Sequence, residues 1–316
     1  MTAEFILVSG GDSGYFPLLE ELALSVRRLR ERDAAPLALL DGGFTDAQRA
    51  RCAELGVDVI AVDWPTDLAR QRCEGRMQLM ANMWKPHLNR LFPERGTVIW
   101  IDGDAWLQTW DAVPLALMAA SKGKLAIVSQ SNRYAQHTVS MRWLVGRQFG
   151  QPRNILHKNA ARAKLPRQIV ANMALRPTLN AGFYALPVDA PHWERLQHWS
   201  EYCLRRGRPF TSDQLAIGVA CFHEGLPWEP LPEICNYHGG PWRYDSARKL
   251  FVEYGPPYAP VSVVHMAGLD AMRGDLEVTE DMVDMNDAPI GRSLRYAAWI
   301  KQAEAAPAMR SAGSAS

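Results

Sequence analysis

The sequence predicts an α/β fold, with a mostly parallel central sheet flanked by helices. Over the first 130 residues, short apolar segments alternate with segments whose apolar residues recur at helical spacing. Turns that contain glycine, aspartate or proline separate these segments. The run Val98-Ile99-Trp100-Ile101 is apolar throughout, which is typical of a strand buried on both faces of a parallel sheet. These observations favour one α/β domain over residues 1–302, followed by a disordered Ala- and Ser-rich tail over 303–316.

The expected elements follow a β-α-β-α-β order at the start of the chain. We expect strands at 5–8, 37–40, 57–62, 98–101, 124–129, 179–186 and, as the last strand, 261–264. We expect helices at 18–32, 45–55 (capped by Thr45), 77–91, 190–205 and 211–222. Prolines indicate a helical or irregular region between 130 and 178, and loops with short strands between 227 and 260.

Composition places the chain among ordinary enzymes. It has 316 residues, a net charge of +1 and no basic excess that would indicate nucleic-acid binding. The five cysteines are widely spaced and form no C-x-x-C pair, so neither a disulfide framework nor a zinc site is indicated. No signal peptide opens the chain, and no apolar run approaches the roughly 20 residues of a membrane span. We therefore expect a cytoplasmic protein with at most peripheral contact at the inner face of a membrane.

The near-zero net charge hides a basic segment at 112–188. This segment contains no Asp or Glu, but holds 11 of the 35 basic residues. Its basic residues are Lys122, Lys124, Arg133, Arg142, Arg147, Arg153, Lys158, Arg162, Lys164, Arg167 and Arg176. A solvated helical surface and a binding surface for an anionic partner both agree with this pattern.

Two carboxylates follow the buried run and are the most informative feature of the chain. Asp102 and Asp104 stand at positions i and i+2 directly after Ile101. Ligand sites of open α/β sheets lie at the carboxyl ends of strands, and buried carboxylates cost free energy unless a cation neutralises them. A hard divalent cation that also binds phosphate oxygens suits such a pair. The sequence therefore predicts a divalent-metal site here.

Several short motifs accompany this D-x-D pair in a fixed order. They are Asp12 to Tyr15 (D-x-x-Y), Lys85, Asn180-Ala181-Gly182, Asp213-Gln214, Leu231 to Asn236 (L-P-x-x-x-N) and His265 to Gly268 (H-x-x-G). In this order they resemble the GT-A fold nucleotide-sugar glycosyltransferases, closest to glycosyltransferase family 8, which includes glycogenin and bacterial galactosyl- and glucosyltransferases. The resemblance covers roughly residues 5–270 and is specific through the order of its motifs, since D-x-D alone is weak evidence.

The resemblance implies a metal-dependent, retaining hexosyltransferase. It implies a UDP-sugar donor and an unidentified saccharide or lipid-linked acceptor, for which the basic segment favours an anionic one. Imidazole among carboxylates tilts the metal preference from Mg²⁺ toward Mn²⁺. The implied metal ligands are Asp102, Asp104 and His265, and the implied catalytic residues are Asp213, Gln214 and Asn180. The implied nucleotide and diphosphate contacts are Asp12, Tyr15, Lys85, Asp102, Gly268 and Arg273. Lys85 would either neutralise the diphosphate or orient an aspartate of the metal pair.

Each of these side chains also has a purely structural interpretation. A histidine at a strand end is often a core residue, and an aspartate often serves at the N-terminus of a helix. The residues for which the sequence leaves both interpretations open are Asp12 and Tyr15 (helix cap and staple), Lys85 (exposed helix lysine), Asn180 (strand bend), Asp213 (helix N-terminus) and His265 (core histidine).

The chain departs from the family pattern at one position. The H-x-x-G turn usually continues to a lysine that binds the diphosphate, but Ala271 stands there. Three alternatives follow: Arg273 replaces this lysine, the basic segment supplies the positive charge, or the diphosphate is bound more weakly. The segment His238 to Trp242 suggests sugar stacking at an acceptor site, and the C-terminal segment 292–301 suggests either docking on the domain or an interfacial membrane helix.

Two other functions remain open from the sequence. A haloacid-dehalogenase-type phosphohydrolase also places D-x-D after an apolar strand and would use Asp102 as the nucleophile. Its motif, however, usually opens the fold, whereas three expected strands precede Asp102 here. A non-catalytic sugar-nucleotide binding protein would agree with the missing lysine at position 271.

Overall fold

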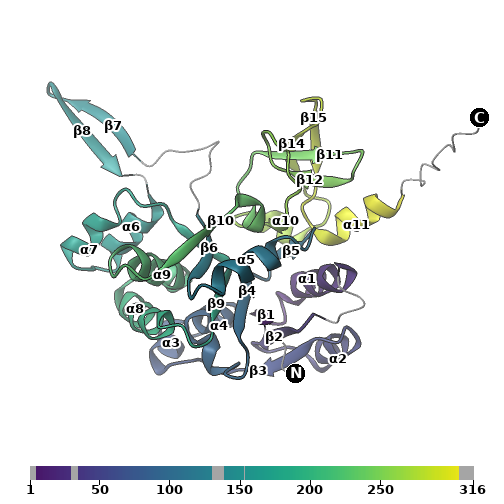
Figure 1. The fold of residues 1–316 in the computed structure, drawn as a ribbon, viewed down its shortest axis with the longest axis horizontal. Coiled ribbons are helices and arrows are strands. Elements are labelled where there is room, and N and C mark those ends of the chain that lie inside the picture. Colours follow the sequence, from purple (N-terminus) through teal and green to yellow (C-terminus); the bar gives the residue numbers. More distant parts are fainter. Residues whose placement is uncertain (1–4, 30–34, 130–138, 153, 306–316) are drawn as a thin grey trace, which may run out of the picture.

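The structure is organised around a seven-stranded sheet with strand order β10-β6-β9-β4-β1-β2-β3 (Figure 1). The computed structural model describes residues 5–29, 35–129, 139–152 and 154–305. Strand β9 runs antiparallel to its neighbours β4 and β6, and the other neighbouring pairs are parallel. The expected α/β fold with a mostly parallel sheet is confirmed. The strands of this sheet are β1 (Phe5–Gly11), β2 (Leu37–Asp41), β3 (Asp58–Ala61), β4 (Thr97–Ile101), β6 (Leu125–Ser129), β9 (Leu179–Pro187) and β10 (Trp228–Leu231).

Helices cover both faces of the sheet because both faces of its strands are apolar. In β4, Val98 and Trp100 belong to one apolar core, whereas Ile99 and Ile101 belong to the other. The first core is closed by α6 (Ile155–Arg162), α8 (His192–Arg206) and α9 (Ser212–Phe222), and the second by α1 (Phe16–Leu29), α2 (Asp46–Glu54) and α5 (Ala112–Ala120). The end of β4 is therefore held rigidly between two layers.

The sequence located most helices to within a few residues. Thr45 forms the expected cap of α2: its side chain accepts a hydrogen bond from the Gln48 N–H, and the Gln48 side chain accepts one from the Thr45 N–H. The single helix expected at 77–91 is instead broken into η1 (Met77–Leu79), α4 (Met80–Trp84) and η2 (Lys85–Arg90). Pro86 has no N–H to continue the α-helical ladder, so the chain tightens there into a 3₁₀ helix. The remaining short helices are α3 (Asp67–Arg72), α7 (Arg167–Asn172), η3 (Pro209–Thr211), η4 (Glu233–Asn236) and α10 (Asp270–Gly274).

Two small sheets were not expected. Strand β5 (Ala105–Leu107) pairs antiparallel with β13 (Val263–His265), which brings His265 opposite Ala105 and next to the D-x-D pair. A four-stranded sheet consists of β12 (Leu250–Val252), β11 (Trp242–Asp245), β14 (Glu280–Asp284) and β15 (Pro289–Arg292). The expectation that the strand at 261–264 is the last one was therefore wrong.

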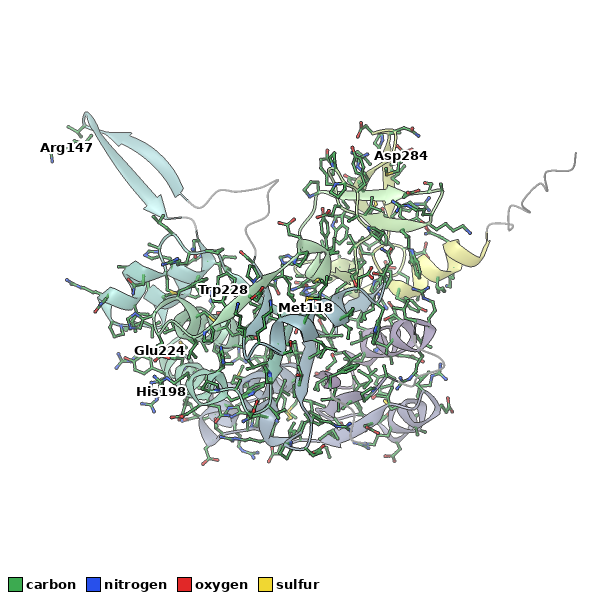
Figure 2. All side chains as sticks on the ribbon, in the orientation of Figure 1. Met118, Arg147, His198, Glu224, Trp228 and Asp284 are labelled. Carbon is green, nitrogen blue, oxygen red and sulfur yellow. The ribbon has the colours of Figure 1, made fainter. Side chains whose placement is uncertain are left out.

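A second correction concerns the basic segment. Residues 139–152 form an antiparallel hairpin of β7 (Val139–Leu144) and β8 (Arg147–Pro152), where helical or irregular structure was expected. Both turn residues, Val145 and Gly146, have positive φ, as in a type I′ turn. A β-branched residue such as Val145 rarely adopts this conformation, so the turn was not predicted from the sequence. Figure 2 shows Arg147 at the tip of the hairpin, directed away from the rest of the chain.

The C-terminal helix α11 (Tyr296–Ala305) docks on the fold. Trp299 is buried with its ring 5.0 Å from that of Trp106, and buried Arg295 pairs with Glu21 of α1. The alternative of an interfacial membrane helix is thus wrong for these residues. Residues 303–305, which were expected to begin the disordered tail, are helical, and the rest of that tail lies outside the described residues. Among the described residues, no helix combines the length and the apolarity that crossing a membrane requires.

Candidate active site

A cavity of about 580 Å³ opens at the carboxyl ends of β1 and β4. All the predicted site residues except Asp12 line it: Tyr15, Lys85, Asp102, Asp104, Asn180, Asp213, Gln214, His265, Gly268 and Arg273. These residues come from eight different elements and loops, so the fold gathers side chains that span more than 250 positions of sequence. The expected position of the site at strand ends is where the cavity lies.

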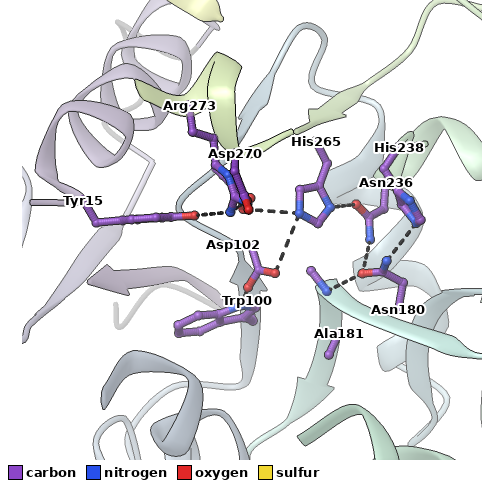
Figure 3. Close-up of polar contacts among 12 residues, drawn as sticks. Tyr15, Trp100, Asp102, Asn180, Ala181, Asn236, His238, His265, Asp270 and Arg273 are labelled. Atoms are coloured by element: carbon purple, nitrogen blue, oxygen red, sulfur yellow. Dashed lines mark hydrogen bonds and ion pairs between the residues drawn. The ribbon is translucent and has the colours of Figure 1, made fainter. Parts of the chain in front are cut away.

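Asp12 has a structural position outside the cavity lining. Its carboxylate accepts a hydrogen bond of 3.0 Å from the Tyr15 backbone N–H, at the start of α1. This hydrogen bond closes the turn that leads into α1 (Phe16–Leu29), which is close to the helix-cap role that the sequence left open. Tyr15 itself reaches the cavity, where its hydroxyl lies 3.0 Å from the Arg273 guanidinium (Figure 3).

Lys85 is buried beneath the D-x-D pair and is not an exposed helix lysine. Its Nζ lies 2.7 Å from Asp102 Oδ1 and 3.1 Å from Asp213 Oδ2, and it donates to the Ala181 carbonyl at 3.2 Å. Burial alone would lower the pKa of Lys85, but the two carboxylates raise it above its usual value. Burial raises the pKa of Asp213, and Lys85 opposes that rise. Lys85 is therefore charged and holds two aspartates in place.

Arg273 forms an ion pair with Asp104, as Lys85 does with Asp102. Its Nη1 lies 2.9 Å from Asp104 Oδ2, and its other terminal nitrogen pairs with Asp270. Burial would raise the pKa of Asp104, but nearby His265 and Arg273 bring it down to about 2. Asp104 is thus a carboxylate near neutral pH. The short helix α10 carries this arginine into the cavity, whereas Ala271 does not line it.

Three ligand atoms remain without a cation and face one another. Asp102 Oδ1 is occupied by Lys85 and by the Trp100 indole N–H, and Asp104 Oδ2 by Arg273. The other oxygens, Asp102 Oδ2 and Asp104 Oδ1, lie 3.8 and 3.3 Å from His265 Nε2. In all, the three groups offer ligand atoms within 4.8 Å of one another. This donor set fits a divalent cation that accepts both oxygen and imidazole ligands.

The charge of the cavity also fits a divalent cation. Its lining contains four aspartates, Asp102, Asp104, Asp213 and Asp270, against Lys85 and Arg273. Four negative and two positive charges leave a balance of −2 with His265 neutral. A cavity of this sign repels a diphosphate unless a cation is bound.

Gly103, Gly182 and Gly268 are among the residues that line the cavity. A Cβ atom at Gly182 would overlap the His265 ring, and one at Gly103 would lie 2.8 Å from Leu19 and 3.1 Å from the Tyr15 ring. Gly268 lines the cavity with a φ of +80°, which favours glycine over other residues. The backbone thus approaches the cavity at points where a side chain would fill it.

The segment around His238 takes a position that the sequence did not predict. Trp242 is fully buried in the core of the small sheet, so its expected role in stacking on a sugar is wrong. His238 instead contacts Asn180, and Asn236 contacts His265. Burial and the neighbouring His265 lower the pKa of His238 to about 3, so its imidazole is neutral near pH 7. The L-P-x-x-x-N motif contained the signal for Asn236, but no local pattern showed that Asn236 contacts both His265 and Asn180.

Solved glycosyltransferases share this architecture. The galactosyltransferase LgtC, in complex with donor and acceptor sugar analogues, gives a TM-score of 0.51 at 16% identity over 83% of this chain and 87% of LgtC. An active-site mutant of LgtC gives 0.52 at 15% identity with the same coverage. The chain has a GT-A-like fold.

Other comparisons limit what this likeness establishes. The bifunctional glycosyltransferase WbbM gives a TM-score of 0.48 at 14% identity over 78% of this chain, and the chain spans only 40% of its length. No protein-family model matches the sequence, and no curated protein matches it. At these sequence identities the likeness establishes the fold alone, and the activity depends on the residues of the site.

Proposed function

We propose that this protein is a metal-dependent glycosyltransferase that moves a sugar from a nucleoside-diphosphate donor to an acceptor. The observation that carries the proposal is the convergence of Asp102 Oδ2, Asp104 Oδ1 and His265 Nε2 inside a cavity that also holds two cationic side chains. The motif order further supports a UDP-sugar donor, a hexosyl group and retention of anomeric configuration. Asp102, Asp104 and His265 would hold Mn²⁺, or Mg²⁺ as the second choice.

We assign a different role in the reaction to each group of residues in the cavity. When bound, the metal ion would act as a Lewis acid on the diphosphate that leaves. Arg273 faces the cavity and can donate hydrogen bonds to phosphate oxygens, which supports its replacing the lysine missing at position 271. Lys85 is too deeply buried for that role and fixes Asp102 and Asp213. We assign Asp213 and Gln214, at the start of α9, to the reacting face of the donor sugar.

The basic segment supports an anionic acceptor, such as an acidic saccharide or a phosphorylated lipid carrier. Helices α6 and α7 and the turn between them expose Lys158, Arg162, Lys164 and Arg167 to solvent. Leu156 of α6 packs against Gly218 of α9, where a Cβ atom would lie only 2.6 Å away. The basic surface is therefore joined to α9, the helix that carries Asp213 in its first turn.

A charge-reversal variant tests the acceptor. Each basic residue near an anionic surface contributes about 1 kcal/mol, so Lys158→Glu combined with Arg162→Glu should raise the acceptor KM more than tenfold. The donor KM should stay at its native value. An unchanged acceptor KM in steady-state assays would exclude this surface from acceptor binding.

Hydrolysis of sugar nucleotides tests the activity itself. Slow, Mn²⁺-dependent hydrolysis of one UDP-sugar from a panel supports the transferase, because water then replaces the missing acceptor. Activity on simple phosphomonoesters would favour the phosphohydrolase, and binding without turnover would favour the non-catalytic binding protein. Asp104→Asn should reduce turnover below about 1% of native while the chain still unfolds cooperatively, because one metal ligand is lost. Preserved turnover in that variant would contradict the metal site.

A further inference from the structure

A continuous chain of hydrogen bonds leads from the backbone of β9 to His265 (Figure 3). The Gly182 N–H donates to Asn180 Oδ1 at 2.7 Å, and Asn236 Nδ2 donates to the same oxygen at 3.0 Å. Asn236 Oδ1 in turn lies 2.8 Å from His265 Nδ1. Each of these side chains is at most 5% exposed, so water does not compete for the contacts.

The backbone end fixes the direction of every bond in this chain. A peptide N–H can only donate, so the atom of Asn180 that faces Gly182 is its carbonyl oxygen. The atom of Asn236 that faces this oxygen has to be a donor, which leaves the Asn236 carbonyl oxygen facing His265. His265 Nδ1 therefore carries a proton and donates it to Asn236. The lone pair of the neutral ring is then on Nε2, the atom that faces Asp102 and Asp104.

We infer that Asn180 is a positioning residue that acts through Asn236 to hold His265 in the tautomer whose Nε2 can bind a metal ion. The inference deepens the proposed function and rests on it for the identity of the metal site. It also changes the role that the family resemblance implies for Asn180. Partners outside the first ligand sphere commonly set the tautomer and orientation of a metal-binding histidine.

The remaining amide group of Asn180 agrees with this role. Its Nδ2 lies 2.8 Å from His238 Nε2, and the amide nitrogen has to donate, so His238 Nε2 accepts. The Asn180 oxygen already accepts two hydrogen bonds and its nitrogen makes one. The Asn180 side chain is thus held between β9, η4 and the loop that contains His238, and among the described residues its second amide N–H makes no further hydrogen bond.

Nitrogen NMR of the metal-free native protein tests the tautomer directly. In a pH titration of ¹⁵N-histidine-labelled protein, only Nε2 of His265 should lose its proton, while Nδ1 should keep it at every pH. The His265 signals are assigned by their loss in His265→Gln. A native ring that loses the Nδ1 proton instead would overturn the inference.

Variants of Asn180 separate positioning from a direct sugar contact. In Asn180→Ala, Asn236 loses its anchor, so the His265 ring should populate both tautomers and Mn²⁺ should bind 10- to 100-fold more weakly in calorimetry. Asn180→Asp still offers oxygens to Gly182 and Asn236, so Nδ1 should stay protonated and Mn²⁺ affinity should be native or higher. Native tautomer and native Mn²⁺ affinity in Asn180→Ala, with only the donor KM raised, would instead show a direct sugar contact.

A matched control comes from another buried asparagine. Asn154 caps α6 and is 8% exposed, against 5% for Asn180. Asn154→Ala should lower thermal stability while leaving Mn²⁺ affinity and the His265 tautomer unchanged. If it weakens Mn²⁺ binding as much as Asn180→Ala does, general destabilisation explains both and the inference is wrong. If native protein binds Mn²⁺ but turns over no sugar nucleotide, the proposed function fails while the tautomer result stands.

Discussion

Replacing Lys85 by methionine should destabilise the protein strongly. Lys85 is 4% exposed and neutralises Asp213, which is 5% exposed, as well as Asp102. Methionine fills much the same volume but leaves the Asp213 carboxylate buried without a cation. Removing one partner of a buried ion pair costs about 3–5 kcal/mol. Because the free energy of unfolding of a domain is only about 5–15 kcal/mol, Lys85→Met should remove a large fraction of it.

Urea unfolding of metal-free protein at pH 8, followed by circular dichroism, measures this loss. Adding Asp213→Asn to Lys85→Met should restore a large part of the stability, because it removes the uncompensated charge. Lys122→Met is the matched control: its side chain is 52% exposed and pairs with Glu229 at the surface. Such exposed pairs contribute about 0–1 kcal/mol, so this variant should remain near native stability.

If Lys85→Met costs no more than Lys122→Met, an unpaired Asp213 carboxylate does not destabilise the protein. If Asp213→Asn worsens the Lys85→Met variant, the loss comes from packing around the methionine and not from the unpaired carboxylate. A change in the urea m-value would indicate an altered unfolded or native state, and the comparison is therefore made at equal m.

Two further predictions concern pH and the metal ligands. Burial and then Arg90 lower the pKa of His87 to about 4, so the unfolded chain takes up this proton first as the pH falls below about 6.5. The free energy of unfolding therefore falls by about 3 kcal/mol between pH 6.5 and pH 4 because of His87. His87→Phe should lack this decrease. Identical pH profiles of urea unfolding for the native protein and His87→Phe would contradict the prediction. Gly182→Ala should weaken Mn²⁺ binding more than tenfold in calorimetry, because its Cβ overlaps the His265 ring, and a native Kd would show that the ring has room to move.

The sequence predicted those parts of the site that depend on strand ends. Asp102 and Asp104 follow β4, the Asn180–Gly182 segment lies in β9, and His265 ends β13. Apolar runs located these strands, and the metal pair lies at the carboxyl end of β4 as expected. The first residues of β9 lie at the same edge because β9 runs antiparallel to β4, and the pairing of β13 with β5 brings His265 beside Ala105. Local pattern was also enough to find most helices of the central layers, whose apolar residues recur at regular spacing.

Other parts depend on contacts that no local pattern encodes. Strands β14 and β15 are short and partly charged, so they resemble loops until the small sheet forms around them. Trp242 was assigned to a sugar surface because an aromatic residue beside glycines is ambiguous, and only the packing of Tyr237 and Phe251 against its ring shows that it is core. The bond between Asn236 and Asn180 joins residues 56 positions apart, and the direction of that bond follows from a backbone N–H in the strand.

The position of Arg273 shows how distant segments complete the site. Arg273 belongs to α10, a helix of only five residues that cannot hold itself in place. Arg295 donates hydrogen bonds to the carbonyls of Met272 and Arg273 while it pairs with Glu21 of α1. A buried ion pair of this kind contributes little net stability, but it fixes the end of α10 against two other helices. The cation that lies beside Asp104 is thus positioned by the C-terminal segment, and it comes from Arg273, two residues after Ala271.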